Sequence, residues 1–510
     1  MRNRSAFRRA QGLLPCTRSL AALAIAGLCS QQLVVADGIT LIEAVKSRNV
    51  ETVMEILKRR VDVNARQADG ATALHWAAHF GEVKIAELLI RAGARPGIAD
   101  DTGVTPIHLA CTNRSDALVD MLLEAGADPN ATLLSGETAL MTCSRTGDVH
   151  AVEALVARGA DVNRKERFHD QTALMWAAAE RHPGVVAALI DRGASVSARS
   201  RTYTQTVTSE VTQRAGREEL NYTVPRGGMT PLLFAARSGD VESARLLIAG
   251  GATVDEALPD GMTALVLAAH SGHQPVGMLL LEKGADPDAS GIGYTALHAA
   301  ILRGGVDLVK ALLAHGANPN LRMTRGTPVR RNSEDFELSA TLVGATPYFL
   351  ASRFLETDIM RALAAGGADT HLAMPSGDTP LMAAVGLGAS AQADRRGLSV
   401  LDGGRLEDEG RVVDAVAAAI AHGADVNAAN RSGDTAMHAA ALVGYQRVIQ
   451  QLADAGARLD VKNARGQTAL TQLTASTGAR TGGALRAPDR SSRGAPESTI
   501  ALLRKLGATE

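Results

Sequence analysis

Residues 69–96 read DGATALHWAAHFGEVKIAELLIRAGARP and determine how the chain is organised. Thr72 is a suitable helix N-cap, because its hydroxyl can accept a hydrogen bond from a backbone N–H that lacks a helical partner. The apolar residues that follow predict a short helix ending at Gly81 and a second ending at Gly93, since Gly adopts the left-handed C-terminal conformation without Cβ strain. Two helices this short cannot bury their apolar faces alone, so the unit requires packed neighbours.

The same unit recurs with a period near 33 residues. Its capping threonines are Thr40, Thr72, Thr105, Thr138, Thr172, Thr230, Thr263, Thr295, Thr346, Thr379, Thr435 and Thr468. The text TPIHLA at 105–110, TALHAA at 295–300 and GADVN at 159–163 resembles the ankyrin repeat. The resemblance covers nearly all of the chain after residue 36. It implies an all-α solenoid of about twelve helix–turn–helix units with β-hairpin finger loops, in a family that binds many partners and rarely catalyses.

The composition agrees with thin helical layers. The chain is 46% hydrophobic but only 3% aromatic, and it contains 50 glycines. Ala, Leu and Val can fill the narrow space between stacked helices without large rings. Each unit contacts mainly its neighbours, so the length of 510 residues does not require several globular domains.

The first 36 residues differ from the array. They carry five arginines and no acidic residue, then an apolar run at 20–28 and Val-Val-Ala ending at Ala36. This pattern predicts a secretory signal peptide cleaved after Ala36, as in an exported ankyrin repeat protein of bacterial type with a periplasmic or extracellular location. An uncleaved anchor or a misplaced start codon is the alternative. The apolar run is too short for a typical membrane span.

The charge balance argues against two classes of partner. Removing residues 1–36 takes away five of the 53 basic residues and none of the 54 acidic ones, which leaves a net charge of −6. A mildly acidic chain with no basic tract has no electrostatic reason to bind nucleic acid or an anionic membrane. We therefore expect a protein partner of unknown identity, no membrane span in the mature chain, and a monomer.

Two cysteines remain after cleavage. Cys111 and Cys143 lie near the ends of first helices, where the repeat pattern has Ala. Stacked helices lie about 10 Å apart, which is too far for a relaxed disulfide. We interpret both as small buried core residues.

Insertions divide the array. The sequence predicts repeats 1–5 at 37–199, an inserted finger or loop at 200–226, repeats 6–8 at 227–320, a second inserted finger or loop at 321–344, and repeats 9–12 at 345–510 with insertions near 389–411 and 476–497. Alternating Thr, Tyr and Val in the first insertion favour an extended β-finger, with a disordered loop as the alternative.

Catalytic chemistry is not indicated. The chain lacks the phosphate-loop, zinc-protease and nucleophile-elbow motifs. His75, His108, His298 and His438 recur at the fourth place of the T-x-x-H text, where the resemblance implies a structural hydrogen bond between hairpin and helix. Each is at least one repeat from the next, so they cannot share a metal within one unit. We expect no catalytic, cofactor-binding or metal-binding residues, no cofactor, and no enzyme.

The remaining candidates are surface residues. By resemblance, the two residues after the Ala-Ala pair of each first helix project onto the concave face. The candidate partner-binding residues are His79, Phe80, Asn113, Arg145, Arg237, His270, Leu302, Arg303, Arg353, Phe354, Leu387, Leu442 and Val443. An apolar strip with an arginine rim favours a protein partner, unless nearby insertions fold over it. The hypothesis is a non-enzymatic scaffold; a ligand-binding or enzymatic role of the insertions and a structural cell-envelope spacer are the alternatives.

Overall fold

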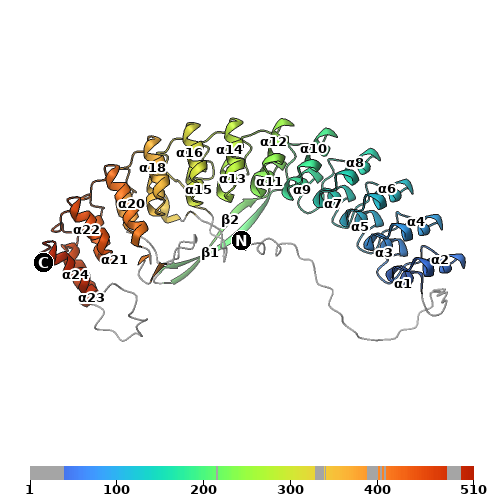
Figure 1. Cartoon of the computed structure of the whole chain (residues 1–510), viewed down its shortest axis with the longest axis horizontal. Coiled ribbons are helices and arrows are strands. Elements are labelled where there is room, and N and C mark those ends of the chain that lie inside the picture. Colours follow the sequence, from blue (N-terminus) through green and yellow to red (C-terminus); the bar gives the residue numbers. More distant parts are fainter. Residues whose placement is uncertain are drawn as a thin grey trace.

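The computed structural model describes residues 40–213, 216–327, 338, 340–386, 400–401, 405–406, 409–478 and 496–509. Consecutive helices form pairs that stack into an arch, with the odd-numbered helices on its inner, concave side and the even-numbered helices outside (Figure 1). This is the predicted helix–turn–helix solenoid. In the ranges searched, no helix is both long enough and apolar enough to cross a bilayer.

The helices are short throughout the stack. The inner helices are α1 (Leu41–Lys46), α3 (Ala73–Phe80), α5 (Pro106–Thr112), α7 (Ala139–Thr146), α9 (Ala173–Ala179), α11 (Pro231–Ser238), α13 (Ala264–Ser271), α15 (Ala296–Leu302), α17 (Pro347–Arg353), α19 (Pro380–Val385), α21 (Ala436–Val443) and α23 (Ala469–Gly478). The outer helices are α2 (Val50–Lys58), α4 (Val83–Arg91), α6 (Asp116–Glu124), α8 (Val149–Ala157), α10 (Pro183–Asp191), α12 (Val241–Ala249), α14 (Gln274–Glu282), α16 (Val306–Ala314), α18 (Thr357–Ala365), α20 (Glu409–Ala421), α22 (Gln446–Asp454) and α24 (Pro496–Lys505).

One continuous apolar core runs along the arch. Leu74, Ile107, Leu140 and Leu174 occupy equivalent places in successive inner helices, and each is at most 1% exposed. Burying one such side chain contributes about 1.5–3 kcal/mol. Because each of these layers is completed by its neighbours, the stability belongs to the stack rather than to any single helix pair.

The predicted caps are present at the helix ends. Thr138 Oγ1 accepts from the Met141 N–H at 3.2 Å, which begins α7, and Gly147 ends that helix with φ of 82°. Thr230 and Gly239 do the same for α11. The repeated threonine and glycine therefore set where each inner helix begins and where many of them end.

Asparagines tie neighbouring hairpins together at one edge of the arch. Asn163 Nδ2 donates to the Gly193 carbonyl at 3.1 Å, and its Oδ1 accepts from the Ser195 N–H at 2.8 Å. Asn64, Asn130 and Asn427 make the same pair of bonds one repeat apart. This explains the asparagine of the recurring G-A-D-x-N text, a role that sequence reasoning had not assigned.

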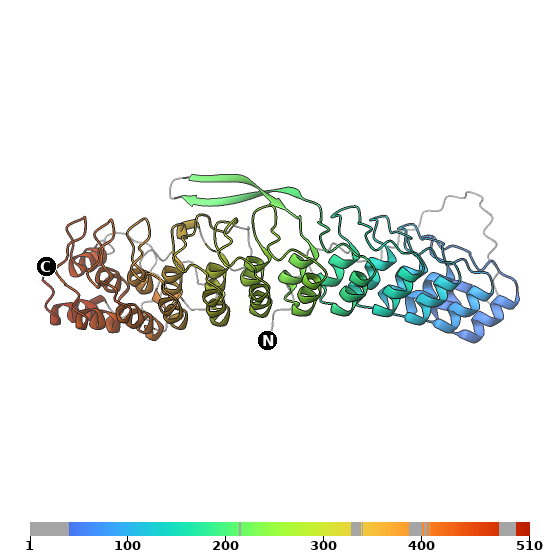
Figure 2. The ribbon, with the colours of Figure 1, turned by 90° about the horizontal axis from the view of Figure 1, so that it is seen from above.

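The first insertion is a long two-stranded antiparallel ribbon. Strands β1 (Tyr203–Gln213) and β2 (Gly216–Arg226) pair from Tyr203↔Arg226 to Gln213↔Gly216, and the ribbon extends from the hairpin edge of the array (Figure 2). At its root, a Cβ on Gly227 would lie 1.8 Å from the carbonyl oxygen of Arg201, so only glycine fits there. The extended form, not the loop, is present.

The other insertions lie partly outside the described residues. In the second, Thr327 N donates to the Leu338 carbonyl at 2.9 Å and a short 3-10 helix, η2, spans Ala340–Leu342. Between α19 and α20, β3 (Val400–Leu401) pairs with β4 (Arg405–Leu406). The predicted signal peptide at 1–36 and most of the last insertion fall outside the described ranges.

Cys111 and Cys143 are buried in the core, as predicted, but the expectation that they are too far apart for a disulfide was wrong. Cys111 of α5 and Cys143 of α7 form a disulfide, with an S–S distance of 2.04 Å and a Cα–Cα distance of 4.7 Å. The prediction used the distance between helix axes. Each Cα lies about 2.3 Å from its own axis, so two Cα atoms that face each other across about 10 Å can come within about 5 Å. The facing positions of adjacent inner helices therefore permit a disulfide.

Candidate partner-binding surface

The recurring histidines belong to the scaffold. Nδ1 of His75 accepts from the Thr72 N–H at 3.1 Å, so Nε2 carries the hydrogen and donates to the Val104 carbonyl of the next hairpin at 3.0 Å. Burial lowers the pKa of His108 and of His298 to about 4, which keeps both rings neutral near pH 7. A neutral ring suits this bridging role, and the structural interpretation of these histidines is supported.

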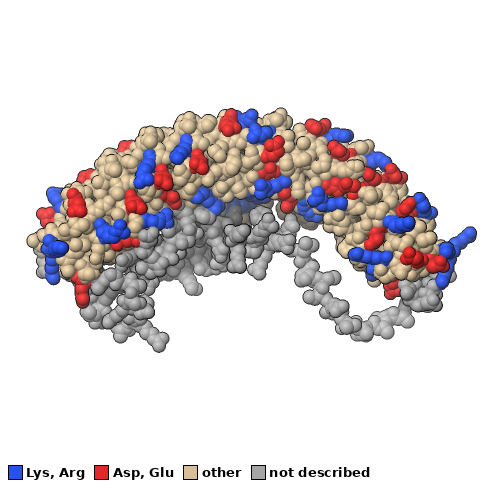
Figure 3. All heavy atoms as spheres, in the orientation of Figure 1, with Lys and Arg blue, Asp and Glu red and all other residues tan. Residues whose placement is uncertain are grey.

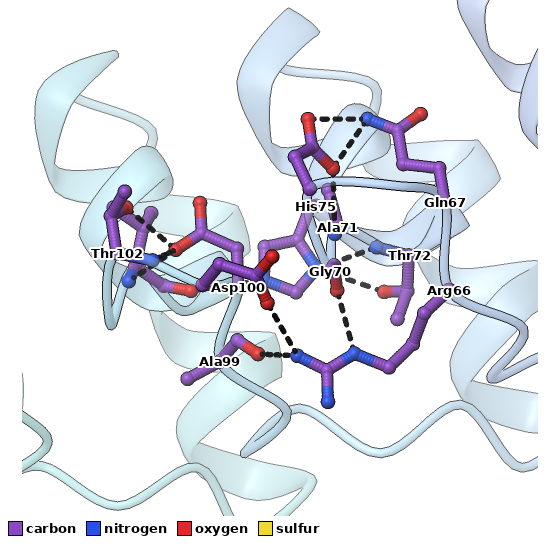
Figure 4. Close-up of polar contacts among 12 residues, drawn as sticks. Arg66, Gln67, Gly70, Ala71, Thr72, His75, Ala99, Asp100 and Thr102 are labelled. Carbon is purple, nitrogen blue, oxygen red and sulfur yellow. Dashed lines mark hydrogen bonds and ion pairs between the residues drawn. The ribbon is translucent and has the colours of Figure 1, made fainter. Parts of the chain in front are cut away.

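Arginines on the hairpins make similar links (Figure 4). Arg66 Nε donates to the Gly70 carbonyl at 3.0 Å, and its terminal nitrogen donates to the Ala99 carbonyl of the following hairpin at 2.7 Å. Arg199 and Arg322 also bridge two carbonyls each. These basic side chains hold hairpins together. Among the described residues, no group of three or more His, Cys, Asp or Glu side chains could hold a metal ion.

An aromatic cluster lies at the N-terminal end of the concave face. The rings of Trp76, His79 and Phe80 lie 5.0–5.7 Å apart between centroids. Lys46 Nζ is 4.2 Å from the centre of the Trp76 ring, and Arg48 lies 4.5 Å from that of Phe80. The cluster therefore combines aromatic rings with cationic side chains. The His79 side chain is exposed at its surface.

Further along the concave face, arginines cover aromatic rings. Arg145 lies 5.0 Å from the Trp176 ring centre and 3.3 Å from Glu137, while Arg237 lies 4.9 Å from the Phe234 ring centre. Such contacts contribute about 0.5–1 kcal/mol at exposed sites. They hold the two arginine side chains in place, which reduces the entropy lost when a partner binds.

Several candidate residues have a second role that the sequence did not reveal. Asn113 Nδ2 donates to the carbonyls of Ala78 and His79 at 2.9 and 2.6 Å. Arg303 Nε donates to the carbonyl of His270 in the preceding helix. The side chain from one repeat thus satisfies the last carbonyls of the previous inner helix. Asn113 and Arg303 therefore stabilise the stack, whatever they contact outside it.

The predicted apolar strip is much reduced. Leu302 is only 4% exposed, so its expected place at the surface was wrong: it fills the core of its own layer. Phe354 and Val443 are half-buried and pack against the core, and Arg353, which precedes Phe354, is also half-buried. Leu442 is 50% exposed. Leu387 lies outside the described residues.

A different apolar patch lies on the hairpin tips. Seven large hydrophobic side chains are exposed among the described residues. Three of them lie on successive hairpins, Leu134 and Phe168 in turns and Tyr203 at the first residue of β1, and they are 65%, 64% and 52% exposed. We call these three residues the tip patch. Their spacing of 34 and 35 residues follows the repeat, a signal that could have located them from the sequence.

Backbone hydrogen bonds hold the three hairpins side by side. Arg167 N donates to the Ser135 carbonyl at 2.9 Å, and Arg201 N donates to the His169 carbonyl at 2.6 Å. Arg201 also pairs with Asp170 at 2.8 Å, and this contact holds the pKa of the Asp170 carboxyl below its usual range. The tip patch is therefore a fixed surface at the root of the β1–β2 ribbon, with charged groups beside it.

Charge elsewhere is mixed. On the face seen in Figure 3, lysines and arginines alternate with aspartates and glutamates along the whole arch. No single-sign field dominates this face, so electrostatic steering towards one kind of polyion is not favoured there.

Comparison with known proteins identifies the repeat. A family model of three ankyrin repeat copies matches residues 41–133, 131–200, 213–291 and 232–323, a model of many copies matches 174–248, and a single-repeat model matches 432–464. Among solved structures, the human ASB11 ankyrin repeat domain is 26% identical, with 48% of this chain and 98% of that chain covered and a TM-score of 0.39. The first model covers more than half of the 510 residues. The chain belongs to the ankyrin repeat family.

Proposed function

We propose that the protein is an exported, non-enzymatic scaffold that binds a protein partner through the concave face and the hairpin tips. Ankyrin repeats are generally protein–protein interaction modules. The observation that carries the proposal is the tip patch, because Leu134, Phe168 and Tyr203 remain more than half exposed on consecutive, hydrogen-bonded hairpins. Exposed apolar side chains that gather on one fixed surface are typical of interaction sites.

The concave cluster is the second part of the proposed surface. Trp76, Phe80, Lys46 and Arg48 combine aromatic rings with cations, the residue classes enriched at the centres of protein interfaces. His79 and Leu442 add exposed side chains at opposite ends of the arch.

Export is supported by the sequence of residues 1–36 and by the disulfide. A buried Cys111–Cys143 disulfide is typical of oxidising compartments and is rare in the cytosol. Cell fractionation followed by N-terminal sequencing tests the proposal. We expect a chain that starts at Asp37 and carries no free thiol. A full-length, thiol-containing chain in the cytosol would refute export.

The binding proposal is tested by crosslinked capture of partners with the mature chain. Phe168→Ser in the tip patch is expected to lose the main partner. Met54→Ser is the matched control, because Met54 is also an exposed large apolar residue, at 42%, but lies on the outer helix α2. Equal partner sets for wild type, Phe168→Ser and Met54→Ser would contradict the assignment of the tip patch. His79→Ala tests the concave cluster in the same experiment.

A further inference from the structure

The two hairpins that carry Phe168 and Tyr203 are rich in basic residues. The first reads RKERFHD at 164–170, and the second reads RSRTY at 199–203, where the β1–β2 ribbon begins on the hairpin edge of the arch (Figure 2). Lysine and arginine outnumber aspartate and glutamate here by five to two, although acidic residues are slightly more numerous in the whole chain. We call the five basic residues, all of them exposed, the basic rim: Arg164, Lys165, Arg167, Arg199 and Arg201.

Neutral groups hold part of the basic rim in place. Lys165 Nζ donates to the Arg199 carbonyl at 3.1 Å, which joins the two hairpins through a side chain. One terminal nitrogen of Arg199 donates to two backbone carbonyls, both at 3.0 Å. A carbonyl carries no net charge, so these bonds orient the two cations and leave their positive charge for a partner.

Both acidic residues of the two hairpins are already engaged. Glu166 is only 5% exposed, and its carboxylate accepts from the N–H groups of Phe168 and His169, both at 2.7 Å. It therefore builds the turn that presents Phe168. Asp170 pairs with Arg201 at 2.8 Å, and among the described residues Arg201 is the only member of the basic rim that pairs with a carboxylate.

The basic rim lies against the tip patch. Arg167 is adjacent to Phe168 in sequence, and its terminal nitrogen donates to the Leu134 carbonyl of the previous hairpin at 3.4 Å. Arg201 is two residues before Tyr203, and its backbone N–H donates to the hairpin of Phe168. Exposed apolar side chains and cations therefore form one surface across three hairpins.

We propose that the tip patch and the basic rim together bind an acidic segment of the protein partner that also carries apolar side chains. The apolar side chains cover the tip patch, and the carboxylates face the basic rim. Complementary charge speeds the encounter and disfavours basic segments. A nucleic acid fits less well, because Leu134, the most exposed large apolar side chain among the described residues, offers a base no ring for stacking. This class of partner rests on the proposed function.

The proposal is tested with a short peptide of repeated Glu-Glu-Phe-Leu units that carries an uncharged fluorophore, by fluorescence anisotropy during titration with the protein. The controls are peptides with every Glu replaced by Gln or by Lys, and oligothymidine. We expect saturable binding of the Glu peptide, about tenfold tighter than that of the Gln peptide and weaker as salt is added. No binding of the Glu peptide, equal binding of the Gln or Lys peptide, or tighter binding of oligothymidine would each overturn the proposal.

Arg167→Glu is the decisive variant, and Arg431→Glu is its matched control. Arg431 is exposed and occupies the same place in its own hairpin, because its N–H donates to the Ser376 carbonyl at 3.0 Å as that of Arg167 does to the Ser135 carbonyl. The hairpin of Arg431 contains no second basic residue. We expect Arg167→Glu to weaken binding of the Glu peptide at least about fivefold and Arg431→Glu to leave it unchanged. Equal affinities of the two variants would contradict the proposal.

Arg164→Glu gives a second reading that does not depend on the hairpin contacts. Arg164 makes no side-chain hydrogen bond or ion pair with a described residue, so this variant should fold normally and weaken binding in the same direction. Capture of the partner that is lost in Phe168→Ser but unchanged in Arg167→Glu and Arg164→Glu would show that the proposed function survives while the acidic segment does not. Capture that none of the three variants affects would overturn both.

Discussion

The disulfide between adjacent inner helices leads to a prediction about local stability. Cys111 and Cys143 are fully buried and separated by 32 residues. For a closed loop of this length, the loss of chain entropy in the unfolded state corresponds to about 3–4 kcal/mol. We therefore expect reduction of the disulfide to destabilise the third and fourth helix pairs by about this amount.

The effect should be local, because each repeat interacts mainly with its neighbours. Hydrogen exchange by mass spectrometry can compare α5–α8 with α21–α22 in oxidised and reduced protein. Since about 1.4 kcal/mol corresponds to a factor of ten, exchange in α5–α8 should accelerate by roughly two to three orders of magnitude after reduction. The distant helices α21–α22 should change little.

A double variant supplies the control. Cys111→Ala with Cys143→Ala places the residue of the usual repeat pattern at both positions, so the fold should be kept and reductant should have no further effect. The reasoning is refuted if reduction of the wild type leaves exchange in α5–α8 unchanged, or if α21–α22 accelerate equally.

Three further perturbations follow from the structure. His298 has a pKa of about 4 in the folded protein and about 6.5 in the unfolded chain, so its full contribution to the free energy of unfolding is present above pH 6.5 and falls by up to about 3 kcal/mol as the pH drops towards 4. The urea midpoint should therefore depend less steeply on pH in His298→Gln than in the wild type, and equal pH dependence would contradict this. Asp288 accepts a hydrogen bond from the Asn318 N–H but lacks the amide N–H donor that Asn163 and the equivalent asparagines have. In Asp288→Asn, the new amide should donate to the Gly316 carbonyl and raise the free energy of unfolding by about 0.5–1 kcal/mol. An unchanged or lower melting temperature would count against this. Gly227→Ala should open the root of the ribbon to proteolysis more than Gly251→Ala does. Both glycines have positive φ, but only at Gly227 would the new Cβ lie 1.8 Å from a carbonyl oxygen. Equal cleavage of the two variants would show that backbone strain, and not the clash, is decisive.

The elements that could be predicted from the sequence are those whose contacts join residues no more than about 35 positions apart in the chain. The N-cap bond seen at Thr138 recurs in other repeats because both partners lie within one repeat. The bridge from His75 to the Val104 carbonyl joins neighbouring repeats, and its two partners lie at a fixed spacing in the sequence. The ribbon at 203–226 was predicted as one of two alternatives, since alternating Thr, Tyr and Val favour extended backbone.

The candidate surface was predicted less well. Leu302 and Leu442 occupy the same place in their repeats, yet one is 4% and the other 50% exposed. Burial at this position depends on the neighbouring units and insertions, which the repeat pattern does not specify. The tip patch was overlooked because its residues lie in hairpins, where the repeat text varies most.

The sequence by itself determined the unit, its period and its caps, because these depend on local hydrogen bonding and on the apolar pattern of one helix pair. Only the tertiary structure decided that the two cysteines meet and which side chains remain exposed on the hairpins. Those properties depend on distances between atoms in different repeats. Such distances are set by how the helices face one another, to within a few ångströms, and the period of a repeat carries no information on that scale.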